Sequence, residues 1–122
     1  MDRKAIIREY KERRPRMGVF QVRNTVTGQV LVGASTDLPA MLNRQRAQLR
    51  LGAHANRRLQ ADWQTHGADA FLFEVLDTLE PPDQPGHDPK DDLRVLEAMW
   101  LEKIAPFDDR GYNSRPRPKP AD

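Results

Sequence analysis

Short runs of apolar residues in the first third of the chain predict β-strands. Residues 19–24 place Val and Phe among polar residues, and residues 30–32 form a compact apolar run. Gly28 lies between the two runs and suits the turn of a hairpin. A third run, "AFLFEVLDTL" at residues 70–79, is rich in apolar and aromatic residues. The pattern therefore predicts a hairpin and one further strand.

Four other segments lie between residues that start or stop helices, and two of them carry an apolar stripe at helical spacing. They are residues 2–14, the stretch from the capping residues 35–37 to Leu51, residues 57–66 after Asn56, and residues 91–104. Each ends next to a Pro or Gly that suits a helix end: Pro15, Gly52, Gly67 and Pro106. The order α-ββ-α-α-β-α predicts an α+β fold, in which helices flank a small three-stranded antiparallel sheet.

Composition narrows the class of protein. A chain of 122 residues suits one domain, and the absence of Cys excludes a disulfide framework and a thiolate zinc site. No apolar run approaches the roughly 20 residues of a membrane span, so we expect no membrane partner. The first residues, "MDRKAIIREY", are too charged for a signal peptide. We therefore expect a cytoplasmic protein.

The basic charge is unevenly distributed, although the formal net charge is only +2. Arginines and lysines gather near the N-terminus and in the tail "RPRPKP". Between Asp37 and Asp62 there is no acidic residue, and five arginines lie there: Arg44, Arg46, Arg50, Arg57 and Arg58. Such a stretch is typical of a surface that binds phosphates, or of a solvated helix face. Charge alone leaves both interpretations open.

Glu97 breaks the pattern of its predicted helix. It lies within the apolar stripe formed by Leu93, Leu96, Trp100, Leu101 and Ile104. A carboxylate in such a stripe is usually paired, hydrogen-bonded or bound to a metal ion. The alternative is a residue at the edge of the stripe whose carboxylate reaches water or an arginine.

Several motifs occur together in one order. "GVFQVRN" is followed by "VLVGASTDL", by "GAHANRRLQADWQTHGADAFLF", by "LEAMWLEKI" and by "GYN". This set resembles the GIY-YIG nuclease domain over residues 17–113. The characteristic positions it matches are Gly18, Gly33, His54, Asn56, Gly67, Glu97 and Asn113. Residues 1–16 then form an N-terminal helical extension, and residues 114–122 a disordered tail rich in Pro and Arg.

The resemblance implies a particular phosphodiester chemistry. In that family an aromatic hydroxyl from each strand of the hairpin helps to activate water, and an arginine on the next helix neutralises the scissile phosphate. A glutamate on a later helix holds one divalent cation, usually Mg²⁺ or Mn²⁺. Glu97 falls on that position and is the implied metal ligand. One carboxylate can suffice, because Mg²⁺ keeps water and substrate oxygens as further ligands.

The sequence departs from this scheme at the catalytic positions. Phe20 and Leu31 stand where the resemblance implies the two hydroxyls, Met41 stands at the arginine, and Gln45 at a basic residue one turn later. Arg44 follows Met41 by three residues and could extend toward the vacated position. His54 could act as a general base, since its ordinary pKa is near neutrality, or could serve as a capping or packing residue.

Three functions remain open from the sequence. The first is a nucleic-acid-binding domain whose phosphodiester hydrolysis is weak or lost, with DNA favoured over RNA. The second is a metal-dependent endonuclease with a rearranged site built on Glu97, Arg44 and His54. The third is a protein-interaction domain without a role in nucleic-acid binding. The oligomeric state is not indicated.

Overall fold

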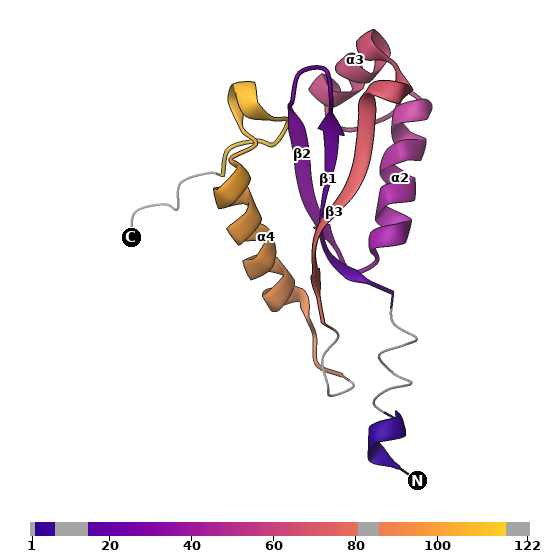
Figure 1. Cartoon of the computed structure of the whole chain (residues 1–122), viewed down its shortest axis with the longest axis vertical. Coiled ribbons are helices and arrows are strands. Elements are labelled where there is room, and N and C mark those ends of the chain that lie inside the picture. The colour runs from indigo at the N-terminus through magenta and orange to yellow at the C-terminus, as the bar shows by residue number, and fades with distance from the viewer. Residues whose placement is uncertain (1, 7–14, 81–85, 117–122) are drawn as a thin grey trace.

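The computed structural model describes residues 2–6, 15–80 and 86–116 (Figure 1). A three-stranded sheet forms the centre, with β1 (Met17–Asn24) between β2 (Val30–Ser35) and β3 (Phe71–Leu79). Both neighbouring pairs of strands are antiparallel. The predicted α+β class with a small antiparallel sheet is therefore confirmed. The strands of the hairpin are longer than predicted, because pairing starts at Met17 and β2 continues to Ser35.

Helices cover both faces of the sheet (Figure 1). α2 (Leu38–Arg50) and α3 (Arg57–His66) lie on one side, and α4 (Lys90–Ile104) lies on the other. In the predicted helix over residues 2–14, residues 3–6 are helical and residues 7–14 fall outside the described residues. Short 3₁₀ turns lie at Ala68–Ala70 and Asp108–Arg110. None of the helices in the described segments is long and apolar enough to cross a membrane.

Local capping explains where α2 and α3 begin and end. The Asp37 carboxylate accepts a hydrogen bond from the Ala40 amide at 3.1 Å, and the Asn56 side chain accepts one from the Leu59 amide at 3.0 Å. Gly67 follows α3 with a φ of 85°, in the left-handed region that glycine adopts without strain. The predicted boundaries of α3 are therefore confirmed.

Alternation along the strands divides the core into two clusters. The cluster between the sheet and α2 and α3 contains Phe20, Val22, Leu38, Leu49, Leu59, Trp63, Ala70, Phe71 and Tyr112. The cluster beneath α4 contains Val19, Val30 and Val32. Leu96, Trp100, Leu101 and Ile104 of α4 pack onto it, as the apolar stripe predicts.

A short segment after α4 runs along the free edge of β2. The Tyr112 amide donates to the Val30 carbonyl at 2.9 Å. The Asn113 side chain accepts from the Val32 amide and donates to the Val32 carbonyl, both at 2.8 Å. Asn113 therefore gives β2 the hydrogen bonds that a neighbouring strand would otherwise supply. This contact fixes the C-terminal segment next to the hairpin.

Candidate nucleic-acid interface and candidate active site

Phe20 and Gly33 face each other across β1 and β2. A Cβ atom at Gly33 would lie 2.7 Å from Cζ of Phe20, so the ring occupies the space that any side chain at this position would need. The ring is only 3% exposed. Gly33 thus provides room for an aromatic residue from the first strand, and the two motifs "GVF" and "LVG" are joined by packing.

The substituted positions lie on one face of the sheet. Leu31 and Met41 are half-buried and pack against the cluster that contains Phe20. The Gln45 side-chain amide donates to Sδ of Met41 at 3.5 Å. Where the resemblance implies two hydroxyls and a guanidinium, this chain therefore has two hydrocarbon side chains and a thioether within one apolar cluster.

His54 is held by hydrogen bonds at both ring nitrogens. Nδ1 accepts from the Asn56 amide at 3.0 Å, which places the ring proton on Nε2, and Nε2 lies 2.5 Å from Oε1 of Gln45. Burial lowers the pKa of His54 below its ordinary value, so the neutral ring is favoured. The ring joins α2 to the loop before α3. It can accept a proton only if one of these contacts opens, and its role as a base stays a prediction.

Glu97 lies on the opposite side of the sheet from the apolar cluster around Phe20. Its helix, α4, packs onto Val30 and Val32, whereas Leu31 faces α2. Glu97 is half-buried, and its carboxylate makes no hydrogen bond or ion pair with any other described residue. Because β2 is an edge strand, the two faces of the sheet adjoin around that edge.

The carboxylates and histidines within the described ranges include no group of three or more placed to hold a metal ion. Glu97 would therefore bind a divalent cation as a lone protein ligand, completed by water and phosphate oxygens. That ligand set is one that Mg²⁺ accepts, since it retains several waters when it binds to proteins. The Glu97 carboxylate is therefore compatible with a bound divalent cation, and its role as a metal ligand remains a prediction.

The three arginines of α2 do not form a single stripe. The Arg46 guanidinium lies 4.5 Å from the centre of the Phe73 ring and donates to the Asn43 side chain. Arg50 is exposed one turn later, at a spacing that shares this helix face. Arg44 is exposed and lies two positions from Arg46, which places it on the other side of the helix. Only Arg44 therefore shares a helix face with Met41.

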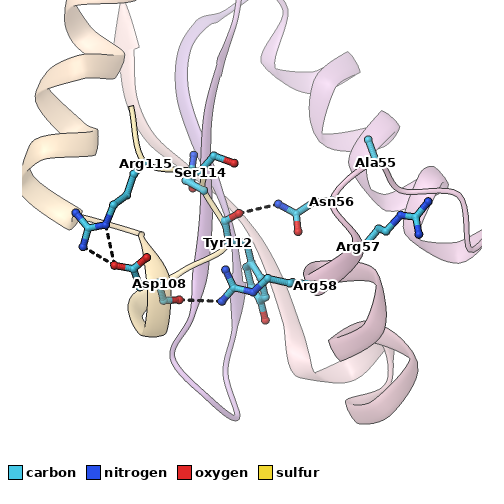
Figure 2. Close-up of a pocket in the computed structure, with 9 residues that line it drawn as sticks. Ala55, Asn56, Arg57, Arg58, Asp108, Tyr112, Ser114 and Arg115 are labelled. Atoms are coloured by element: carbon cyan, nitrogen blue, oxygen red, sulfur yellow. Dashed lines mark hydrogen bonds and ion pairs between the residues drawn. The ribbon is translucent and has the colours of Figure 1, made fainter. Parts of the chain in front are cut away.

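Arg57 and Arg58 begin α3 and line a groove that the sequence analysis did not identify (Figure 2). The groove has a volume of about 560 Å³ between the start of α3 and the segment after η2 (Asp108–Arg110). Its lining is Ala55, Asn56, Arg57, Arg58, Asp108, Tyr112, Asn113, Ser114 and Arg115. Two features of the sequence could have indicated this groove: the pair Arg57 and Arg58, and the basic tail that contains Arg115. They lie far apart in the chain.

Tyr112 lines this groove, and its hydroxyl is bound to residues beneath the groove surface. Its hydroxyl donates to Asp62 at 2.6 Å and accepts from the Asn24 side chain at 3.1 Å. Burial, followed by the hydrogen bond to Asp62, raises the pKa of Tyr112 to about 12. The phenol is therefore neutral at physiological pH and acts as a donor to a carboxylate. The motif "GYN" in the sequence does not by itself indicate this role for the tyrosine.

Comparison with known structures places the fold. Two structures of the catalytic domain of the homing endonuclease I-TevI match 80% of this chain with a TM-score of 0.65. The first is 26% identical and is covered over 96% of its length. The second, a variant in which a glutamate is replaced by alanine, is 24% identical and is covered over 92%. The chain has the GIY-YIG nuclease fold.

One curated relative supports the same assignment from sequence. Intron-associated endonuclease 1 of Enterobacteria phage T4 is 28% identical to this chain over 87 residues, which is 71% of the chain. The chain spans only about a third of that relative, 32% of its length. No protein-family model matches the chain. The resemblance drawn from the ordered set of motifs over residues 17–113 is confirmed, and in fold the chain is similar to the catalytic domain of a homing endonuclease.

Proposed function

We propose that this GIY-YIG-type domain binds nucleic acid, DNA in preference to RNA, and that its phosphodiester hydrolysis is weak or lost. The observation that carries the proposal is the apolar packing of Phe20, Leu31 and Met41. These three positions are the ones where the resemblance implies two water-activating hydroxyls and a phosphate-neutralising arginine. Neither a phenylalanine, a leucine nor a methionine can move a proton or offset negative charge.

The size of the expected loss favours binding over cleavage. Hydrolysis of a phosphodiester needs an activated nucleophile and stabilisation of the charge that develops on the phosphate. Removal of one preorganised donor typically costs roughly 10²–10³ in rate. Losses of groups that act together do not simply multiply, but here three are absent at once. Phosphate contacts can contribute affinity without any of these groups.

Arginines on two helices support the binding half of the proposal. Arg46 and Arg50 share one face of α2, Arg44 lies on another, and Arg57 and Arg58 begin α3. Each guanidinium that reaches a phosphate releases condensed counterions, so affinity should fall as salt rises. DNA is the favoured partner because the relatives are a homing endonuclease and an intron-associated endonuclease.

A divalent cation, Mg²⁺ or Mn²⁺, is proposed at Glu97. The carboxylate is half-buried and has no hydrogen-bond or ion-pair partner among the described residues, so it is available to a cation. The chemistry a bound cation would supply is polarisation of a phosphate oxygen. In a Mn²⁺ titration followed by NMR, paramagnetic broadening should centre on Glu97 and be absent from Glu97→Gln. Equal broadening in both proteins would show that the carboxylate is not the ligand.

A second candidate function is an active endonuclease with a rearranged site. Arg44 favours it, because it is exposed and shares the helix face of Met41. In this account Arg44 neutralises the phosphate, Glu97 holds the metal ion, and Nδ1 of His54 releases the Asn56 amide to act as a base. The three groups come from α2, α4 and the loop before α3, so substrate binding would have to bring them together.

One set of measurements separates these functions. Binding of a short fluorescent duplex is measured by anisotropy at several salt concentrations, and plasmid nicking is measured with Mg²⁺ and with Mn²⁺. Our proposal predicts salt-dependent binding with little or no nicking. Metal-dependent nicking that Glu97→Ala abolishes would favour the rearranged endonuclease. If the duplex did not bind even at low salt, the domain would instead suit protein interaction.

A further inference from the structure

The groove beside α3 contains three arginines and one carboxylate (Figure 2). Arg115 and Asp108 lie at one side of it, Arg57 lies at the other, and Arg58 stands between them. The arginines exceed the carboxylate by two positive charges, three against one. Such an excess in an open groove favours an anion.

We propose that this groove binds a backbone phosphate of the nucleic acid, and that Asp108 competes with the phosphate for Arg115. The inference rests on the proposed function, since it assigns a place on the surface to the nucleic-acid strand. It adds a phosphate site built by the C-terminal segment, which lies outside the catalytic positions implied by the resemblance, and a residue that weakens binding at that site.

The arginines of the groove are oriented before a ligand arrives. Arg58 donates through Nη2 to the Asp108 carbonyl at 2.8 Å, and its guanidinium lies 5.8 Å from the centre of the Tyr112 ring. These contacts hold the guanidinium over the groove while most of its donors remain available. A guanidinium that is already in position loses less side-chain entropy when it binds a phosphate.

The wall opposite α3 is also fixed. The Asn56 side chain donates to the Tyr112 carbonyl at 2.7 Å, so the loop before α3 and the C-terminal segment are joined directly. Asn113 is tied to Val32 by two hydrogen bonds, and Tyr112 is tied to Asp62. These hydrogen bonds fix the two walls of the groove relative to each other, which suits a preformed site for a phosphate.

Asp108 holds Arg115 in an ion pair at the surface. Its Oδ2 accepts from Nε of Arg115 at 2.8 Å and also from Nη2. The two side chains are 61% and 68% exposed, so the pair is screened by salt and weak. A phosphate can displace the carboxylate from Arg115, and the repulsion between the two anions then lowers affinity. Removing the carboxylate charge should strengthen binding.

The backbone at Asp108 makes a clean test possible. Its φ is 55°, in the left-handed region that asparagine and aspartate adopt more readily than other residues except glycine. Asp108→Asn therefore removes one negative charge with no added backbone strain. Asp109→Asn is the matched control, since it makes the same change in net charge at an exposed neighbour that does not line the groove.

Duplex binding by the full chain is measured by anisotropy across a salt series. We expect Asp108→Asn to raise affinity on the order of three- to tenfold at low salt, the range that one nearby charge supplies. We expect the salt slope to steepen by about one, because Arg115 gains a phosphate contact. Asp109→Asn should change affinity by less than about twofold. Arg115→Ala should abolish the gain caused by Asp108→Asn in the double variant.

Equal effects of Asp108→Asn and Asp109→Asn would overturn the groove assignment, because net charge alone would then explain them. A gain that survives Arg115→Ala would also overturn it. The proposed function stands in either case if Arg46→Glu with Arg50→Glu weakens duplex binding. If the parent binds no duplex at any salt concentration, the proposed function and this inference are both wrong.

Discussion

The Phe20 ring fills the space above Gly33, with Cζ 2.7 Å from where a Cβ atom of residue 33 would stand. This contact couples the two strand motifs and leaves no room for a side chain at Gly33. It also places a hydrocarbon ring, 3% exposed, at the position where the resemblance implies a catalytic hydroxyl. The packing of the two strands at this position therefore needs only the ring and not a hydroxyl.

Gly33→Ala should destabilise the domain by about 1–3 kcal/mol, since the new methyl group forces the Phe20 ring to move within a packed core. The free energy of unfolding is measured by urea denaturation. Phe20→Leu replaces the ring with a shorter side chain and should relieve the clash with the methyl group added at position 33. We therefore expect the double variant to lose less than the sum of the two single losses. Strict additivity would show that the two residues do not compete for this space.

Tyr112→Phe should reduce the free energy of unfolding by about 1–3 kcal/mol, because Asp62 and Asn24 lose a buried partner. Thermal and urea unfolding both measure this loss. Tyr10 lies outside the described residues, so the indicated control is a change at an exposed site such as Val26→Ala. A tyrosine that contributes only its ring would make the phenylalanine variant as stable as the parent.

The same tyrosine predicts a pH dependence in the alkaline range. Its pKa is raised from the ordinary 10.0 to about 12, so folding favours the protonated phenol. The stability that this hydroxyl contributes is complete below about pH 10 and is lost as the pH rises toward 12. The difference in unfolding free energy between parent and Tyr112→Phe should therefore shrink across this window. A difference that stays constant to pH 12 would contradict the assignment.

The fold was largely predictable because its signals are local. Asp37 and Asn56 cap helices within three residues of themselves, and Gly67 ends α3 where the sequence indicates. The groove was not predictable, because its walls come from residues that lie 50 or more positions apart, such as Arg58 and Asp108. The ties of Asn113 to Val32 span 81 positions. Only the folded chain shows which basic residues share a surface.

The sequence identifies the individual residues of the candidate site but not how they are arranged in space. The departures at Phe20, Leu31 and Met41 were evident from the motifs, and the structure adds that the three side chains pack in one cluster. His54 was assigned two alternatives. Its Nδ1 accepts from the Asn56 amide two positions away, and its Nε2 lies against the side chain of Gln45, nine positions away on α2. The tautomer cannot be read from the sequence.

His54 should stabilise the domain less as the solution becomes acidic. Burial lowers the pKa of its ring, so the unfolded chain takes up a proton more readily than the folded chain. Its contribution is complete above the ordinary value of 6.5 and is lost as the pH falls below it. Urea denaturation from pH 7.5 to 5 should show a smaller decline for His54→Gln than for the parent. Identical declines would mean that other groups govern this range.

Arg46→Glu with Arg50→Glu should weaken duplex binding and flatten its salt dependence by about one unit of slope for each phosphate contact removed. Arg94→Glu with Lys103→Glu makes the same change in charge on α4 and serves as the control. We expect the α4 pair to have a smaller effect. If both pairs reduced affinity equally, the interface would not be on α2.

Restoring the missing groups tests whether the site has been degraded. The triple variant Phe20→Tyr, Leu31→Tyr and Met41→Arg supplies the two hydroxyls and the cation and leaves Glu97 unchanged. We expect it to nick plasmid DNA faster than the parent with Mg²⁺ or Mn²⁺. The same variant with Glu97→Ala is the control and should be inactive. Circular dichroism checks that the larger side chain at position 31 has not unfolded the domain.

The most direct test of the account is the nicking rate of the parent protein itself. Supercoiled plasmid and single-stranded DNA are incubated with excess protein and with Mg²⁺ or Mn²⁺, at a salt concentration where duplex binding is saturated. The account predicts binding without cleavage above the rate of Glu97→Ala. Rapid cleavage by the parent that is lost when Glu97, Arg44 or His54 is replaced would contradict it, because the site would then have been rebuilt rather than lost.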